Sequence, residues 1–198
     1  MRSHSLPRRQ DGIVLMVALI MLVAMSLAGV ALMRSVETAV MVAGNFAFKE
    51  AAVQSADQGV QAAALWVGTT NKNMPATLYD DNPATGYFSS LPGVDPDFFD
   101  DSTWATALSV NGGAPDAAGN RVRYIVHRMC SQRSMNWSDP DNQCAVQTTA
   151  AGEGDGYSNK PGAPPPVSLP LVYYRVTTRV DGPRNTVTIT QTSLAQKI

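Results

Sequence analysis

The chain has 198 residues, which is enough for one folded domain and a short additional segment. Only 16% of the residues are charged and the formal net charge is −1, so the chain lacks the basic surface of nucleic-acid-binding proteins and we expect no nucleic-acid partner. Hydrophobic residues make up 44% of the chain, and many of them lie in one block near the N-terminus.

That block, residues 13–33, has 21 residues without a charge and is interrupted only by Ser26 and Gly29. A helix needs about 20 apolar residues to cross a bilayer, whereas the apolar part of a secretory signal has about 7 to 15. Three arginines and one aspartate precede it in residues 1–12, and Arg34 follows it. Because arginines on the short N-terminal side keep that end in the cytoplasm, the sequence predicts a single-pass anchor with the residues after Arg34 outside the inner membrane.

The junction between the basic segment and the apolar block is Gly12-Ile13. A peptidase that cuts at the cytoplasmic face needs a small residue there and an apolar stem after it. The junction resembles a prepilin cleavage site, with a leader of residues 1–12 and a methylated Ile13. The alternative is an uncleaved anchor that happens to begin with a glycine.

Residues 34–67 contain no proline, are rich in alanine and carry few charges. Alanine favours helix, so we expect the membrane helix to continue past the bilayer as an amphipathic second half. Phe46, Val53, Val60 and Val67 recur every seven residues and predict an apolar stripe. A helix this poor in charge needs two apolar neighbours. One helix of a periplasmic bundle would explain the alanines equally well.

These segments together resemble the N-terminal region of PilX-like minor type IV pilins. The matching stretches cover residues 8–65: the run after Gly12, the Arg34-Ser35 exit, Ala43-Gly44-Asn45 and Gln54-Ser55-Ala56-Asp57. The resemblance implies a prepilin peptidase as processing partner and a pilus, beyond the inner membrane, as final location. It implies that the stem helix contacts other minor and major pilins, and that the head contacts a possible tip adhesin.

The residue type at Val17 differs from that of the major pilins. It would be the fifth residue of the processed chain, where major pilins carry a glutamate that neutralises the N-terminal ammonium of a neighbouring stem. A buried unpaired charge is costly, so a subunit without this carboxylate is poorly suited to repeated stacking in the shaft. The resemblance therefore predicts a place in the initiation or tip complex.

Residues 68–198 are expected to form a globular head. Residues 68–120 are rich in loop-forming residues, with a short helix expected around 102–108. Residues 121–129 alternate polar and apolar side chains and predict a half-buried strand. A loop is expected at 152–170, followed by an antiparallel hairpin at 171–193. The predicted fold is α+β and pilin-like, with the long N-terminal helix packed on a small antiparallel sheet.

The two cysteines, Cys130 and Cys144, would lie outside the cytoplasm and are therefore expected to form a disulfide. The bond would close a 15-residue loop and stabilise the head by about 3 kcal/mol. Trp137 within this loop is expected to be exposed, which makes it a candidate partner-binding residue. The alternative is that the bond only restrains a long excursion from the sheet.

The sequence carries no recognisable catalytic or cofactor-binding motif, so we expect a non-enzymatic protein without cofactor or metal. His127 falls in a predicted strand, where histidine is more often packed than catalytic. Two acidic clusters, residues 95–101 and Asp139 with Asp141, lack the spacing of a calcium loop.

Two other functions remain open on the sequence alone. The chain could be a minor pseudopilin of a type II secretion system, which shares the same architecture. It could also be a signal-anchored periplasmic binding or enzymatic domain, whose leader would stay intact or be cut by an ordinary signal peptidase, for instance near Ala31.

Overall fold

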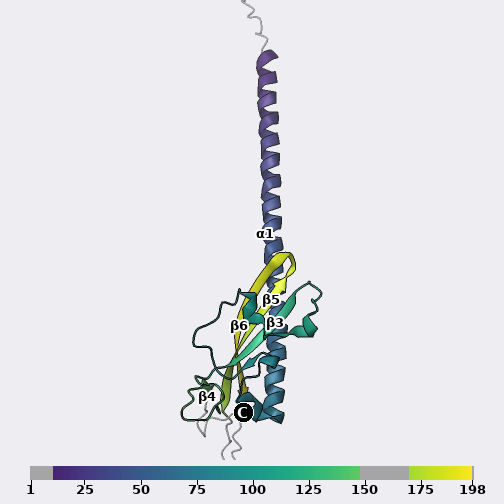
Figure 1. Cartoon of the computed structure of the whole chain (residues 1–198). Coiled ribbons are helices and arrows are strands. Elements are labelled where there is room, and N and C mark those ends of the chain that lie inside the picture. Colours follow the sequence, from purple (N-terminus) through teal and green to yellow (C-terminus); the bar gives the residue numbers. More distant parts are fainter. Residues whose placement is uncertain (1–10, 148–169, 198) are drawn as a thin grey trace, which may run out of the picture. The chain divides into compact units, whose positions relative to one another are not determined.

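The computed structural model describes residues 11–147 and 170–197 (Figure 1). These residues form two compact units, one that ends at Ala47 and one that begins at Phe48, and the second is called the head. A single helix, α1 (Asp11–Asn73), begins in the first unit and ends in the head. The predicted leader lies almost wholly outside the described residues, as does the predicted loop at 152–170.

In the first unit, α1 presents apolar side chains on all sides. The large side chains from Ile13 to Met33 are exposed, Leu15 by 74% and Met33 by 72%. The most apolar stretch has a mean hydropathy of 2.8, so α1 is long and apolar enough to cross a membrane. This agrees with the prediction of a long apolar N-terminal helix.

In the head, residues 48–73 of α1 bury a stripe of small side chains. Ala52, Ala56, Gly59, Ala63 and Val67 recur every three or four residues and lie against the sheet. Gly59 makes the closest approach, because a Cβ atom there would lie 2.7 Å from Cγ2 of Thr178. Small residues therefore set how closely the helix and the sheet can pack.

The predicted stripe of Phe46, Val53, Val60 and Val67 is only partly buried. Val67 is buried and Val60 packs against the core, whereas Phe46 is 68% exposed and Val53 is 39% exposed. Smaller side chains form most of the buried face, since close packing against a sheet selects for them. The helix also runs six residues beyond the expected end at residue 67 and stops at Asn73, two residues before Pro75, which cannot continue it.

The sheet of the head has six strands: β1 (Tyr87–Phe88), β2 (Leu108–Ser109), β3 (Arg121–Arg128), β4 (Val146–Gln147), β5 (Leu171–Gly182) and β6 (Thr186–Lys197). β5 is central, with β3 and β4 along one edge and β6 along the other. β1 runs parallel to β3 and the remaining pairs are antiparallel. The sheet is therefore mixed, which corrects the prediction of an antiparallel one.

The C-terminal hairpin is the longest pairing. β5 and β6 pair without a gap from Leu171–Lys197 to Gly182–Thr186, so β6 reaches four residues beyond the expected end at 193. The turn between them contains a 3₁₀ turn, η5 (Pro183–Asn185), with Arg184 and Asn185 at positive φ. Asparagine tolerates this conformation more readily than most residues, and the turn closes the two strands.

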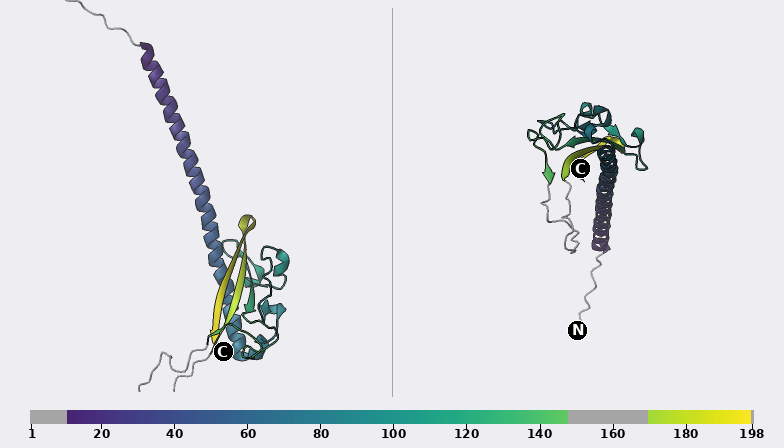
Figure 2. Two further views of the ribbon diagram at one scale, coloured as in Figure 1. Left: turned by 90° about the vertical axis from the view of Figure 1, so that its left-hand side faces the viewer. Right: turned by 90° about the horizontal axis from the view of Figure 1, so that it is seen from below.

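The sheet lies between α1 on one face and loop segments on the other (Figure 2). Val122, Tyr124 and Val126 of β3 belong to the core on the helix side. On the other side, Arg123 binds Asp101, and His127 stacks on Phe88. β3 is therefore buried along most of both faces, and the prediction of a half-buried strand is wrong because the loop layer covers its second face.

The loop layer contains single 3₁₀ turns. The expected helix at 102–108 is replaced by η3 (Asp101–Trp104), after which Leu108 already pairs with Tyr124 of β3. The other 3₁₀ turns are η1 (Pro75–Leu78), η2 (Pro83–Thr85) and η4 (Val110–Gly113). Trp104 anchors this layer, being almost fully buried with its indole N–H donated to the carbonyl of Phe98 at 2.9 Å.

Candidate interaction surfaces

The first candidate surface is the exposed apolar helix of the first unit. Ile13 and Val17 are exposed by 59% and 47%, and a Cβ atom added at Gly12 or Gly29 would meet nothing within 4 Å. The hydroxyl of Ser26 donates to the carbonyl of Leu22 at 2.8 Å, so this polar group is satisfied within the helix itself.

Arg34, the residue predicted to mark the exit from the membrane, is also exposed, and its carbonyl accepts a hydrogen bond from the hydroxyl of Thr38 at 2.6 Å. In an apolar medium every polar group needs an internal partner, and α1 provides one for both hydroxyls. The surface can therefore enter a bilayer or a bundle of similar helices without leaving these groups unpaired.

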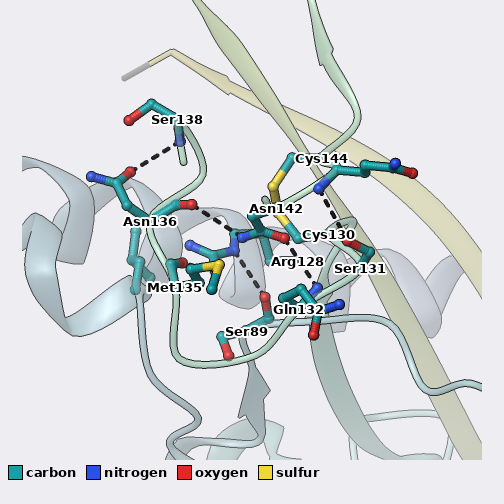
Figure 3. The surroundings of a disulfide bond; sticks show 12 residues. Ser89, Arg128, Cys130, Ser131, Gln132, Met135, Asn136, Ser138, Asn142 and Cys144 are labelled. Carbon is teal, nitrogen blue, oxygen red and sulfur yellow. Dashed lines mark hydrogen bonds between the residues drawn. A yellow bond between two sulfur atoms is a disulfide. The ribbon is translucent and has the colours of Figure 1, made fainter. Parts of the chain in front are cut away.

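The second candidate surface is the loop closed by the disulfide between Cys130 and Cys144 (Figure 3). This bond confirms the predicted pairing. Asn142, which is almost fully buried, organises the loop from inside: its side-chain oxygen accepts the N–H of Gln132, and its amide donates to the carbonyl of Asn136 at 3.1 Å. The loop is thus a folded structure with exposed polar side chains, including Ser131, Gln132, Ser138 and Asp141.

Arg128 holds this loop to the sheet. Its Nε atom donates to the carbonyl of Ser89 at 2.9 Å, and a terminal nitrogen donates to the carbonyl of Met135 at 2.5 Å. The residue is only 1% exposed. Burial raises the pKa of the neighbouring Tyr174 to about 12 while Arg128 opposes that rise, so the tyrosine stays neutral beside the buried cation. A buried cation is costly unless such acceptors surround it.

Sequence reasoning missed both Arg128 and Asn142. For Arg128 a signal was present, because strand alternation places it on the same face as Val122, Tyr124 and Val126. An arginine in register with three apolar residues indicates a buried position. For Asn142 no sequence signal was available, since its neighbours are all polar loop residues.

Trp137 differs from the prediction. The side chain is half-buried and packs against the main core, so the expectation of an exposed indole is wrong. A loop tethered by Arg128 and by the disulfide lies close to the sheet, and its largest apolar side chain turns inward. The exposed surface of the loop is therefore formed mainly by its polar side chains.

The acidic residues of the head are used in turns and ion pairs. Asp95 binds Arg175 at 2.7 Å, Asp97 accepts the N–H of Phe99, and Asp100 accepts the N–H of Ser102. Within residues 11–147 and 170–197, no three acidic, histidine or cysteine side chains are placed so that they could hold a metal ion.

His127 lies in a buried position beneath Phe88, with ring centroids 5.0 Å apart. Burial lowers the pKa of His127 to about 4, and the nearby cation Arg175 acts in the same direction. The imidazole is therefore neutral at physiological pH. Its Nδ1 atom has no hydrogen-bond partner among the described protein atoms.

Comparison with known protein families, with curated proteins and with solved structures found no match. The head offers a sheet covered by residues 48–73 of α1 and by loops, together with a tethered polar loop, and the first unit offers an exposed apolar helix.

Proposed function

We propose that this chain is a minor pilin of the PilX-like kind, which takes part in type IV pilus assembly and has no catalytic role. The observation that carries the proposal is the continuity of α1. One helix contains an exposed apolar stretch long enough for a bilayer and a later stretch whose small side chains pack against the sheet of the head. A subunit that is stored in a membrane and later joins a helical bundle needs both parts in one element.

The junction at Gly12 and Ile13 supports the same proposal. Both residues lie in α1, and a Cβ atom added at Gly12 would have open space around it. No other segment of the described chain therefore lies against Gly12. After cleavage, the apolar helix would begin at Ile13 with a methylated amino group.

Val17 supports a place at the tip or in the initiation complex. Its valine side chain cannot neutralise the ammonium of a neighbouring stem, and an unpaired charge buried in a filament core would cost several kcal/mol. At a tip, no subunit above requires that pairing. Labelled antibody distributed evenly along sheared pili would contradict this placement.

The decisive experiment is mass spectrometry of the N-terminus of the native protein. We expect a chain that begins with N-methyl-isoleucine at residue 13. The variant Gly12→Leu should retain residues 1–12, while the matched variant Gly29→Leu should be processed normally, because a Cβ atom has free space at both positions. An intact N-terminus in the native protein, or a cut near Ala31, would refute the proposal in favour of an ordinary anchored periplasmic domain.

A minor pseudopilin of a type II secretion system would give the same mature N-terminus. Deletion of the gene distinguishes the two systems. Loss of surface pili with normal protein secretion supports the pilus, whereas loss of protein secretion with normal pili supports the secretion system. The proposed partners, namely other minor and major pilins at the stem and a tip adhesin at the head, belong to the pilus version.

A further inference from the structure

Two arginines face each other directly across strands β3 and β5. Arg123 and Arg179 are register partners, and both contact the loop layer, Arg123 through Asp101 and Arg179 through the ring of Trp104. Like charges placed opposite each other in a sheet repel and need compensating anions. Asp181 compensates both arginines, because one of its oxygens accepts from Nε of Arg179 at 2.9 Å and the other accepts from Arg123 at 2.8 Å.

Asp101 is the second anion of this network, and its contacts leave the arginines short of acceptors. Its Oδ1 atom accepts from Arg123 at 2.7 Å but lies 3.5 Å from a terminal nitrogen of Arg179. That nitrogen has no hydrogen-bond acceptor among the described atoms, although Arg179 is only 7% exposed. Buried N–H groups without an acceptor are unfavourable, so the two arginines are incompletely compensated.

Arg121 adds a third cation beside this pair. It is exposed, and its register partner is Asp181, whose two oxygens already accept from the other arginines. Within residues 11–147 and 170–197, Arg121 forms no ion pair. Asp116, which is near in the chain, turns its carboxylate to Ser55 and to the N–H of Asn120. Three arginines therefore share two aspartates, and one positive charge is uncompensated.

Arg121 and Arg179 line an open cleft of about 570 Å³ at the turn between β5 and β6. A volume of this size is typical of sites for small molecules. The lining also includes Pro115, Pro183 and Val187, which are apolar. The cleft therefore combines two cations with an apolar surface, and it lies wholly within the head.

We propose that this cleft binds a monocarboxylate joined to an apolar group, as presented by a small organic acid or by the C-terminal residue of a partner protein. The planar guanidinium of Arg121 matches the two oxygens of a carboxylate, and Arg179 adds its positive charge. A single surplus charge suits a singly charged group, since the second charge of a phosphate would face Asp181 without compensation. The apolar lining suits the group attached to the carboxylate. This inference goes beyond the proposed pilus function and does not depend on cleavage at Gly12.

The test uses the full chain in detergent micelles, titrated with butyrate and followed by the NMR signals of the backbone amides of Gly182, Asn185 and Val187, which line the cleft. The neutral isostere butyramide is the matched control for the ligand. We expect saturable binding of butyrate with a dissociation constant on the order of 1 mM, because a partly exposed charge pair contributes little. Butyramide and inorganic phosphate should bind more weakly than butyrate.

An acetylated tripeptide Ala-Ala-Val, with a free carboxylate or as its C-terminal amide, distinguishes the two sources of the carboxylate. Tighter binding of the free acid than of butyrate would assign the cleft to a protein C-terminus. Binding no tighter than that of butyrate would assign it to a small acid. The amide should bind more weakly than the free acid in both cases.

Arg121→Gln should weaken the binding of butyrate about tenfold, because it removes the charged donor. Arg184→Gln is the matched control for the protein, because it makes the same change of charge in the adjacent turn, where Arg184 lies over Phe48 and does not line the cleft. It should leave binding unchanged. Both arginines are exposed, so both variants should keep the amide spectrum of the parent protein outside the changed site.

Four results would overturn the proposal. Equal weakening by Arg121→Gln and Arg184→Gln would show that only the overall charge of the head matters. Butyramide that binds as tightly as butyrate would exclude recognition of the carboxylate, and tighter binding of phosphate would exclude a singly charged ligand. Binding that does not saturate by about 100 mM butyrate would show that the cleft is no site for this class of ligand.

Discussion

Gly59 sets the distance between α1 and the sheet, so an added methyl group there should push the two layers apart. In Gly59→Ala the new Cβ atom would lie 2.7 Å from Cγ2 of Thr178 and 3.1 Å from Cγ1 of Val122. Both neighbours are β-branched and buried in the paired strands β5 and β3, so neither can rotate away freely.

Two opposing terms decide the magnitude. Overpacking a core costs about 1–3 kcal/mol, while alanine favours a helix interior over glycine by about 1 kcal/mol. Gly68→Ala is the matched control, because its nearest neighbour would be the flexible amide of Gln196 at an ordinary 3.6 Å. We expect Gly68→Ala to stabilise the head by up to about 1 kcal/mol and Gly59→Ala to be less stable than this control by about 1–3 kcal/mol.

The assay is urea unfolding of the full chain in detergent micelles, followed by tryptophan fluorescence, since all three tryptophans lie in the head. Thr178→Ser removes the methyl group at 2.7 Å and should recover part of the loss when combined with Gly59→Ala, which a double-mutant cycle would report as a favourable coupling. Equal stabilisation by Gly59→Ala and Gly68→Ala would refute the close packing described here.

Three further changes address other contacts of the head. His127→Phe should flatten the pH dependence of stability between pH 6.5 and pH 4, because the unfolded imidazole binds a proton near pH 6.5 and the buried one only near pH 4. The parent protein should lose about 3 kcal/mol of unfolding free energy across this window. An equally steep loss in the variant would contradict the assignment of this pH dependence to His127. Replacing Cys130 and Cys144 together by alanine should lower the free energy of unfolding by about 3 kcal/mol, measured by urea unfolding. An unchanged midpoint would show that closing the loop does not stabilise the head. Ser55→Ala should cost about 1–3 kcal/mol in the same assay, because the buried amide of Asn120 loses its acceptor at 2.9 Å, and a neutral result would indicate that the loop readjusts.

The elements that could be foreseen are those with a strong local pattern. The apolar block at 13–33 predicts a helix by its length, the alternation at residues 121–129 predicts a strand, and the β-branched and aromatic residues at 171–180 predict another. The pairing of Cys130 with Cys144 follows from there being two cysteines. Each of these inferences needs only residues that are close in sequence or few in number.

The elements that could not be foreseen depend on which surfaces the chain brings together. The face of α1 that is buried in the head contains alanine and glycine, whereas the hydrophobic pattern pointed to Val53, which is exposed, and to Val60, which is only partly buried. Likewise, Trp137 turns inward because Arg128 holds its loop close to the sheet, a contact between residues whose sequence gives no sign of their proximity. Long-range packing decides both cases.

The two layers that cover the sheet are attached by different chemistry. The helix packs mainly through apolar side chains, whereas the loop layer adds ion pairs of Arg123 with Asp101 at 2.7 Å and of Arg175 with Asp95 at 2.7 Å to its buried Trp104. Arg123 lowers the pKa of the Asp101 carboxyl, so this attachment weakens as pH falls through that lowered pKa, and salt screens it as well. Acid and salt should therefore loosen these two ion pairs first, while the buried Trp104 and the pairing of β1 and β2 with β3 keep the loop layer on the sheet.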